Sequence, residues 1–203
     1  MRLGVMGGTF DPVHYGHLVT AEEALVQFNL DSVVFMPTGR PVRKTHLSVS
    51  CAEDRYIMTV VATASNPDFS VSRLEIDRAG DTYTVDTMLA MRESSGPHAE
   101  LFFITGADAV REILTWRGAE RLAELCTFIA ATRPGFESDL PVEPSEAGGP
   151  ALPKVECMEV PALAISSSDI RQRVAEHRPV RYLLPESVAA YAEKMGLYRA
   201  TSR

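Results

Sequence analysis

Two histidines three positions apart, His14 and His17, follow a glycine pair near the beginning of the chain. They come directly after a short apolar segment, residues 3–6, that has the pattern of a buried strand. Where a strand, a glycine turn and a helix start meet, backbone N–H groups and the positive end of the helix dipole point toward the same place, which suits an anion. Imidazoles there can donate hydrogen bonds to phosphate oxygens and, when protonated, add positive charge. The spacing therefore predicts a phosphate site.

A second group of polar residues lies near the other end of the chain, where three consecutive serines are followed by Arg171. Hydroxyls at a helix start, with a guanidinium one turn in, would hold a polyphosphate. Between the two groups, Gly106 and Asp108 follow an apolar segment. Such a glycine lets a nucleotide approach the backbone, and the Asp108 carboxylate could accept hydrogen bonds from ribose hydroxyls. Each feature alone is commonly structural, so the prediction of a nucleotide site rests on their combination.

Apolar segments alternate with helical periods along the chain, and these elements must position the polar groups. The alternation predicts parallel βαβ units with right-handed crossovers. We therefore expect an α/β fold, a Rossmann-like doubly wound parallel sheet of strand order 3-2-1-4-5 with a small C-terminal helical extension. In such a sheet ligands bind beyond the carboxyl ends of strands 1 and 4, where the winding reverses. Strands are predicted over residues 3–6, 32–37, 69–76, 100–105, 127–131 and 155–160.

Other segments carry weaker signals. Ser50 and Glu53 have the spacing of a capping box and predict a helix that places Tyr56, Val60 and Ala64 toward the core. The segment 136–154 contains four prolines and two glycines, sustains neither period and is expected to be a mobile surface loop. Residues 165–203 are expected to form the helical C-terminal part of a single domain that spans residues 1–203.

The composition limits the class of protein. A chain of 203 residues with 45% hydrophobic and 23% charged residues is typical of one globular domain. The net charge of −7 argues against a nucleic-acid surface, so an anionic ligand must be met by a local cluster of donors. Without a long apolar run or a signal-peptide pattern, we expect a soluble cytoplasmic protein that does not bind membranes. The cysteines, Cys51, Cys126 and Cys157, are far apart and are expected to be reduced and buried.

Residues 165–171 read Ile-Ser-Ser-Ser-Asp-Ile-Arg. Together with the His-x-Gly-His element at 14–17, this segment resembles the nucleotidyltransferases that carry an Ile-Ser-Ser-Thr-x-Ile-Arg signature, with Ser168 keeping the hydroxyl of the usual threonine. Over nearly its full length the chain is similar to the bacterial nicotinate-nucleotide adenylyltransferases. That similarity includes Thr-Tyr-Thr-Val-Asp-Thr at 82–87, Trp116, Arg-Pro-Gly at 133–135, and the ending between Tyr182 and Tyr198.

The resemblance implies a reaction and a set of site residues. The enzyme would transfer AMP from ATP to nicotinate mononucleotide in NAD biosynthesis, giving nicotinate adenine dinucleotide and pyrophosphate, with Mg²⁺ carried by ATP and no metal held by the protein. The implied catalytic residues are His14, His17, Lys44 and Arg171. The residues expected to contact ATP are Gly7, Gly8, Thr9, Phe10, His14, His17, Gly106, Asp108, Ser166, Ser167, Ser168 and Arg171. Those expected to contact nicotinate mononucleotide are Thr9, Lys44, Thr82, Tyr83, Thr84, Trp116 and Arg133.

Physical arguments accompany some of these roles. The face of Trp116 could stack on a pyridine ring, although core packing is nearly as good an interpretation of the residue alone. Backbone N–H groups of Tyr83 and Thr84, at a helix start, could receive the nicotinate carboxylate, which an amide lacks. The family's lysine is matched by Lys44, with Arg43 and His46 as alternatives.

Three other interpretations of the sequence compete with this one. A sister adenylyltransferase would use nicotinamide mononucleotide or phosphopantetheine as the acceptor. A non-catalytic sensor would only bind ATP, but it would not need donors on both sides of the α-phosphate. An aminoacyl-tRNA synthetase fragment is disfavoured by the short, acidic chain and the lack of a lysine-rich second signature. The sequence leaves open whether the chain forms a homo-oligomer.

Overall fold

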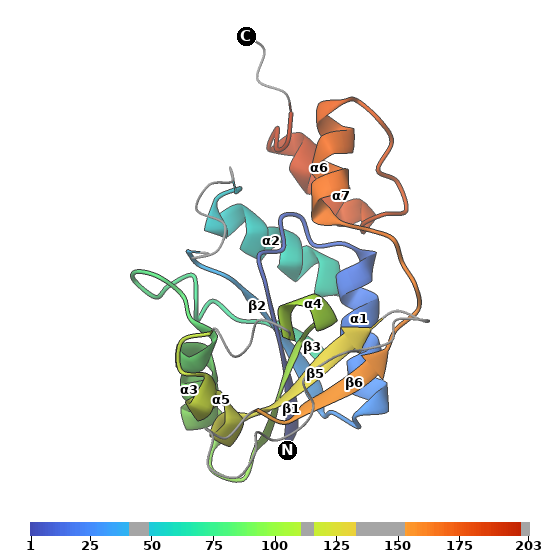
Figure 1. Cartoon of the computed structure of the whole chain (residues 1–203). Coiled ribbons are helices and arrows are strands. Elements are labelled where there is room, and N and C mark those ends of the chain that lie inside the picture. The colour runs from blue at the N-terminus through green and yellow to red at the C-terminus, as the bar shows by residue number, and fades with distance from the viewer. Residues whose placement is uncertain (41–48, 111–115, 133–152, 200–203) are drawn as a thin grey trace.

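The predicted strands form one parallel sheet in a computed structural model, which describes residues 1–40, 49–110, 116–132 and 153–199 (Figure 1). The strands are β1 (Arg2–Gly8), β2 (Ser32–Pro37), β3 (Phe69–Val71), β4 (Glu100–Gly106), β5 (Thr127–Thr132) and β6 (Val155–Glu159). The helices are α1 (Tyr15–Gln27), α2 (Ala52–Thr63), α3 (Thr84–Ser95), α4 (Ala107–Val110), α5 (Ala119–Leu125), α6 (Ser167–Ala175) and α7 (Glu186–Lys194). Of the loop predicted over 136–154, residues 136–152 lie outside the described residues.

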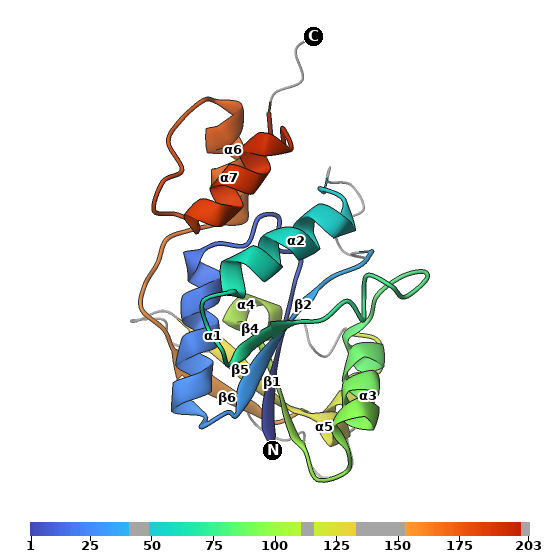
Figure 2. The same ribbon diagram turned by 180° about the vertical axis from the view of Figure 1, so that it is seen from behind.

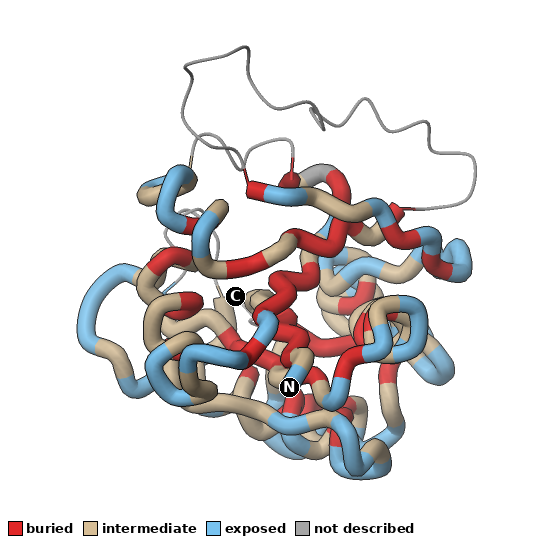
Figure 3. Tube along the Cα trace, turned by 90° about the horizontal axis from the view of Figure 1, so that it is seen from below, coloured by how far each residue is buried: buried red, intermediate tan, exposed pale blue. Residues whose placement is uncertain are grey.

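The strand order is β3-β2-β1-β4-β5-β6, and every neighbouring pair is parallel. This order confirms the predicted doubly wound sheet and adds β6 at its edge. Helices α1 and α3 lie on opposite sides of the sheet (Figures 1 and 2). Because side chains alternate along a strand, Val5 of β1 packs in one hydrophobic core and Met6 in the other. Buried residues therefore gather along the strands in the interior (Figure 3).

One strand is shorter than predicted. The sequence predicts a strand over residues 69–76, but β3 ends at Val71. The chain turns there because the Ser72 hydroxyl accepts the N–H of Leu74, and the N–H of Asp77 bonds to the carbonyl of Arg73. The apolar residues after Val71 therefore do not continue the sheet.

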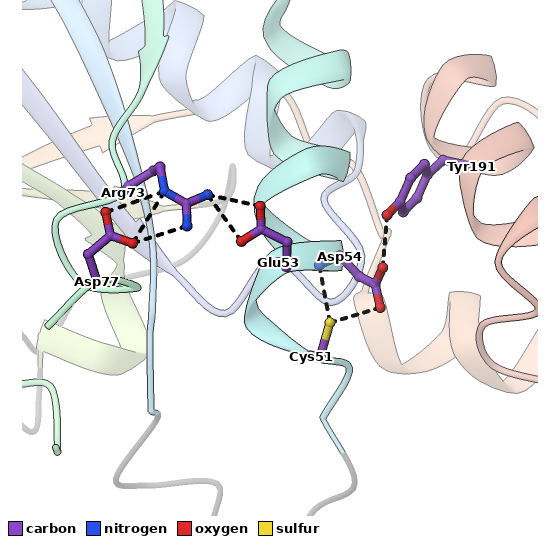
Figure 4. A network of polar contacts seen from close by, with 6 residues as sticks. All are labelled: Cys51, Glu53, Asp54, Arg73, Asp77 and Tyr191. Atoms are coloured by element: carbon purple, nitrogen blue, oxygen red, sulfur yellow. Dashed lines mark hydrogen bonds and ion pairs between the residues drawn. The ribbon is translucent and has the colours of Figure 1, made fainter. Parts of the chain in front are cut away.

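The predicted capping box of α2 is wrong. The N-cap residue is Cys51, whose sulfur accepts the N–H of Asp54 at 3.4 Å. Ser50 is one residue too early, and its backbone N–H donates instead to the Asp11 carboxylate at 3.2 Å. Glu53 forms an ion pair with Arg73 at 2.9 Å rather than turning back to the helix start (Figure 4).

The buried face of α2 also differs from the prediction. Tyr56 is partly buried, whereas Val60 and Ala64 are exposed. The buried positions are Arg55, Met58, Thr59, Ala62 and Thr63. The spacing of apolar residues did not predict this buried face, because the face contains an arginine and two threonines. The polar groups of these three residues all bond to backbone carbonyls.

Helices α6 and α7 form the predicted C-terminal extension, and α7 packs against α2 (Figures 1 and 2). Val188 and Ala192 of α7 are buried in the same core as Met58 of α2. At the edge of this contact the Tyr191 hydroxyl donates to the Asp54 carboxylate at 2.8 Å (Figure 4). The chain beyond residue 165 therefore returns to elements built from its first 65 residues.

None of the three cysteines forms a disulfide, and only Cys126 is buried, whereas Cys51 and Cys157 are exposed. The prediction of three buried cysteines is therefore wrong for two of them, because one caps a helix and the other lies on the edge strand β6. Within the described part of the chain, no helix combines the length and the apolar character that a membrane crossing requires.

Candidate active site

The loop between β1 and α1 is held by a buried aromatic ring. Phe10 has φ of 49° and only 2% of its surface is exposed. A Cβ atom at Gly8 would lie 2.8 Å from this ring, and one at Gly7 would lie 2.9 Å from the ring of Phe103. The glycine pair is therefore required for packing, since side chains at either position would displace a core ring.

The two histidines stack on each other at the beginning of α1. Their ring centroids are 3.8 Å apart, and Gly16 makes this possible because a Cβ there would lie 3.0 Å from the His14 ring. The backbone N–H of His14, the N-cap residue, donates to Nδ1 of His17 at 3.2 Å. Because Nδ1 accepts, the proton of a neutral His17 ring lies on Nε2, which is thereby defined as a donor.

His14 is a neutral residue in this site. It is 6% exposed, and burial lowers its pKa to about 4. Its Nδ1 atom is buried and has no hydrogen-bond partner among the described residues. At neutral pH His14 can therefore donate a hydrogen bond but carries no positive charge. The expectation that a protonated imidazole adds positive charge to the site does not hold for His14.

A cavity of about 280 Å³ opens beside the histidines. Thr105 and Gly106 line it at the carboxyl end of β4, the predicted crossover point of the sheet. A Cβ added at Gly106 would meet nothing within 4 Å, so the backbone there is open to a ligand. Apolar residues make up much of the rest of the lining, namely Ala131, Val160, Pro161, Leu163 and Ile165. An apolar lining with a few polar donors suits a nucleotide.

The serine segment meets the β1–α1 loop. Helix α6 begins at Ser167, whose hydroxyl donates to the carbonyl of Pro12 at 2.9 Å. Arg171 donates from Nη1 to the carbonyl of Asp11 at 2.6 Å and from Nη2 to the Ser168 hydroxyl at 3.3 Å. Ser166 is the N-cap of α6, and its hydroxyl accepts the N–H of Asp169. The two predicted phosphate elements are therefore brought together, on residues that directly precede His14.

Of the residues predicted to contact the acceptor, Tyr83 and Trp116 lie elsewhere, on the face of the sheet covered by α3 and α5. Trp116 packs edgewise on Phe103 and Phe128, with centroids 6.2 and 6.1 Å away. Tyr83 is the N-cap residue of α3, and Thr84 is the first residue of that helix. The Thr82 hydroxyl accepts the N–H of Arg40 at 3.4 Å. None of Thr82, Tyr83, Thr84 and Trp116 lines the cavity beside the histidines.

Several predicted site residues cannot be placed. Lys44, with its alternatives Arg43 and His46, and Arg133 lie outside the described residues. The backbone of Asp108 belongs to α4, but its side chain is outside the described part. Their roles stay predictions, as do the roles of the residues that the structure places.

Comparisons with known proteins match this architecture. A family model described as cytidylyltransferase-like matches residues 5–173. A Streptomyces coelicolor protein named "probable nicotinate-nucleotide adenylyltransferase" is 58% identical over 196 residues, covering 96% of this chain and 99% of its own length. A protein of the same name from Moorella thermoacetica is 55% identical over 203 residues, with 98% and 92% covered.

The chain belongs to the nicotinate-nucleotide adenylyltransferase family. The fold of this nucleotidyltransferase is also found in solved structures. Plasmodium falciparum nicotinic acid mononucleotide adenylyltransferase complexed with NaAD has a TM-score of 0.75 at 20% identity, with 97% of each chain covered. The same Plasmodium enzyme complexed with APC has a TM-score of 0.74, also at 20% identity, covering 97% of this chain and 96% of that one. At this identity the structures confirm the fold of the family member.

In this member of the family, sequence reasoning missed Arg55, which is 1% exposed. Its guanidinium donates to the carbonyls of Thr9 at 2.9 Å, Gly39 at 3.1 Å and Ser50 at 3.0 Å. Burial lowers its pKa, while Asp11 foremost among the nearby groups opposes that effect. Arg55 thus ties the glycine loop to both ends of the segment that follows β2. No sequence signal separated it from a surface arginine.

Arg117 was also missed. Its guanidinium carbon lies 4.7 Å from the centroid of the Tyr83 ring, a cation–π distance. Because Arg117 directly follows Trp116, it connects the two aromatic residues that the resemblance assigns to the acceptor. Its position directly after Trp116 in the sequence is a signal from which Arg117 could have been predicted as a site residue.

Glu75 carries a testable pH dependence. It is 6% exposed, and burial raises its pKa to about 7, although the Thr87 hydroxyl, which donates at 2.6 Å, and the charges of Arg78 and Arg55 oppose this. An unfolded chain loses this proton near pH 4.5. Between these values the folded protein holds a proton that the unfolded chain has released, so the free energy of unfolding falls as the pH rises.

We expect Glu75→Gln, which keeps an acceptor for Thr87 but cannot ionise, to unfold at a higher temperature than the wild type at pH 8. The difference should shrink toward zero as the pH falls to 5. Thermal unfolding of both proteins across this range measures it. A difference that does not change with pH would contradict the assignment to Glu75.

Proposed function

We propose that this chain transfers AMP from ATP to nicotinate mononucleotide, releasing pyrophosphate and forming nicotinate adenine dinucleotide for NAD biosynthesis. The observation that carries the proposal is the contact of Arg171 with Asp11 and of Ser167 with Pro12, beside the stacked histidines and a cavity of about 280 Å³. Curated relatives at 55% and 58% identity bear the name of this activity.

The reaction needs no covalent intermediate. A 5′-phosphate oxygen of the mononucleotide attacks the α-phosphorus of ATP in line, the bond from that phosphorus to the bridging oxygen breaks, and pyrophosphate leaves. His17 donates from Nε2, and neutral His14 adds a second hydrogen bond, to phosphate oxygens on which charge builds up. Arg171 and the serines at the start of α6 hold the β- and γ-phosphates, and Lys44 holds a reacting phosphate.

Mg²⁺ enters the proposal as part of the substrate. The polar side chains on the cavity are imidazoles and hydroxyls, not the carboxylates that Mg²⁺ prefers. Among the described residues, no group of three or more His, Cys, Asp or Glu is arranged to hold a metal. We therefore assign the ion to the phosphates of ATP and not to a site on the protein.

The acceptor site is proposed at the start of α3. Backbone N–H groups of Tyr83 and Thr84 would receive the nicotinate carboxylate, and the ring of Trp116 would stack on the pyridine. Thr9, Thr82 and Arg133 would contact the rest of the mononucleotide. A carboxylate gains more at a helix N-terminus than an uncharged amide does, so the site favours nicotinate over nicotinamide.

Trp116→Ala is expected to raise KM for nicotinate mononucleotide by about tenfold and leave KM for ATP within about twofold, because only the pyridine loses a stacking partner. Steady-state kinetics with each substrate varied in turn measures the two constants. Trp116→Phe, which keeps an aromatic ring against Phe103 and Phe128, should recover most of the affinity. Equal loss for both substrates would show that Trp116 acts only through packing.

The proposed function is tested by incubating the purified protein with ATP, Mg²⁺ and one acceptor at a time. The acceptors are nicotinate mononucleotide, nicotinamide mononucleotide and phosphopantetheine. We expect pyrophosphate release and an adenylylated product with the first at the highest kcat/KM. A preference for another acceptor would replace the proposed substrate, and ATP binding without pyrophosphate in any mixture would identify a sensor.

We further propose that the enzyme works in the cytoplasm without nucleic acid or membranes. The lack of a disulfide among the three cysteines and the net charge of −7 support this proposal.

A further inference from the structure

Asp11 is a buried carboxylate in the middle of the β1–α1 loop, 3% exposed. Its two carboxylate oxygens accept hydrogen bonds from different parts of the chain. Oδ1 accepts from the Tyr198 hydroxyl at 2.7 Å, and Oδ2 accepts from the backbone N–H of Ser50 at 3.2 Å. Its backbone carbonyl accepts from Arg171 at 2.6 Å. One loop residue therefore joins the segment before α2, the guanidinium of α6 and the chain beyond α7.

Tyr198 reaches Asp11 from the segment that follows α7. Its φ is 65°, and its ring packs partly buried against the core that contains Phe10 and Met58. Burial, and then the charge of Asp11, raise the pKa of Tyr198, so its hydroxyl keeps its proton and acts as a donor. The contact is thus a charge-assisted hydrogen bond out of bulk water, which is stronger than a neutral one.

The loop is fixed at successive positions by side chains from outside it. Arg55 donates to the carbonyl of Thr9, Tyr198 to the carboxylate of Asp11, and Arg171 to the carbonyl of Asp11. Two residues after Pro12 the chain reaches His14, the N-cap of α1. Because the carboxylate and the carbonyl belong to the same residue, a displacement of Asp11 would shift both the carbonyl that accepts from Arg171 and the backbone that leads to the two imidazoles.

We propose that Tyr198 is a positioning residue for adenylyl transfer, because its hydroxyl fixes Asp11 and through it the placement of Arg171 and the histidine pair. The inference rests on the proposed function for its kinetic part. Tyr198 does not line the cavity and so acts through Asp11 rather than on the nucleotide. Phosphate chemistry depends on such placement, since a displacement of about 1 Å can cost a factor of about 100 in rate.

The chain contains a matched control. Tyr191 also donates its hydroxyl to a carboxylate, Asp54, at 2.8 Å, and it also ties the C-terminal segment to α2 (Figure 4). Asp54 contacts Cys51 at the helix start and does not touch the β1–α1 loop. Tyr191→Phe and Tyr198→Phe each remove one hydroxyl and with it one hydrogen bond to a carboxylate. The variants differ in the carboxylate that loses its donor, Asp54 in the first and Asp11 in the second.

The experiment measures kcat, KM for ATP, the unfolding temperature and hydrogen exchange of the amides of residues 9–17 in both variants and the wild type. We expect Tyr198→Phe to lower kcat by about tenfold, with a smaller change in KM, and to speed exchange in the loop. Tyr191→Phe should keep kcat within about twofold at a similar loss of unfolding temperature. If Tyr198 only stabilised the fold, the two variants would lose kcat to the same extent.

The outcomes separate the two proposals. Unchanged kcat and exchange in Tyr198→Phe, or equal losses of kcat in both variants, overturn the positioning role. If the wild type releases no pyrophosphate with any acceptor, the proposed function fails instead. Exchange in residues 9–17 of nucleotide-free protein still decides the role of Tyr198 in that case, because faster exchange only in Tyr198→Phe supports it and equal exchange in the two variants overturns it.

Discussion

Replacing His17 by alanine is expected to lower kcat by a factor of about 10² to 10³, as the loss of one well-placed transition-state donor typically does. His17 lines the cavity, and its Nδ1 is occupied by the backbone N–H of His14, so Nε2 is the atom that carries the donated proton. Alanine would also leave the His14 N–H without this acceptor. Single-turnover rates at saturating ATP measure the chemical step directly.

The control for this variant is His98→Ala. His98 is exposed and precedes the amino end of β4, whereas the cavity lies at the carboxyl end of that strand. We expect it to keep wild-type turnover. Near-normal turnover in a folded His17→Ala protein would show that the imidazole pair stabilises the helix start and has no role in the reaction.

Arg171→Ala is expected to cause a comparable loss in kcat and, in addition, to raise KM for ATP by about tenfold or more, because a guanidinium binds the departing phosphates in both the ground state and the transition state. The side chain already lies at the loop, through Asp11 and Ser168. Kinetics with varied ATP, together with direct nucleotide binding, measures both effects.

Arg173 offers a matched comparison on the same helix. It pairs with Asp169 at 2.7 Å, away from the loop. Arg173→Ala removes the same group from α6 and should leave KM for ATP within about twofold, since exposed ion pairs contribute little. Equal effects of the two replacements on ATP affinity would indicate that α6 needs arginines for its folding and that Arg171 has no phosphate role.

The sheet could be predicted because its central strands are buried on both faces and therefore appear as continuous apolar runs such as residues 101–104. The β1–α1 loop could be singled out as a candidate phosphate site because its glycines and histidines are close together in the sequence. What the sequence did not reveal depends on contacts between distant residues. Arg55 is buried only because three carbonyls from separate segments satisfy its donors. Tyr198 meets Asp11 across 187 positions.

The residues predicted to bind the acceptor show a different limit of sequence-based prediction. Both interpretations of Trp116 agree with its place in the structure, since the ring makes T-shaped contacts with two core phenylalanines but is only partly buried. Neither composition nor burial separates the two roles. The comparison of Trp116→Ala with Trp116→Phe does, because a stacking role depends on an aromatic face.

The return of α6 and Tyr198 to the first loop has a consequence for how the enzyme is made. During translation, the glycine loop and both histidines leave the ribosome long before Arg171 and Tyr198 are synthesised. A nascent chain can therefore assemble much of its sheet while the proposed triphosphate site still lacks the guanidinium. Termination soon after β6 would remove Arg171 and also Val188 and Ala192, which cover Met58 of α2, so we expect it to yield an inactive polypeptide with part of its core exposed.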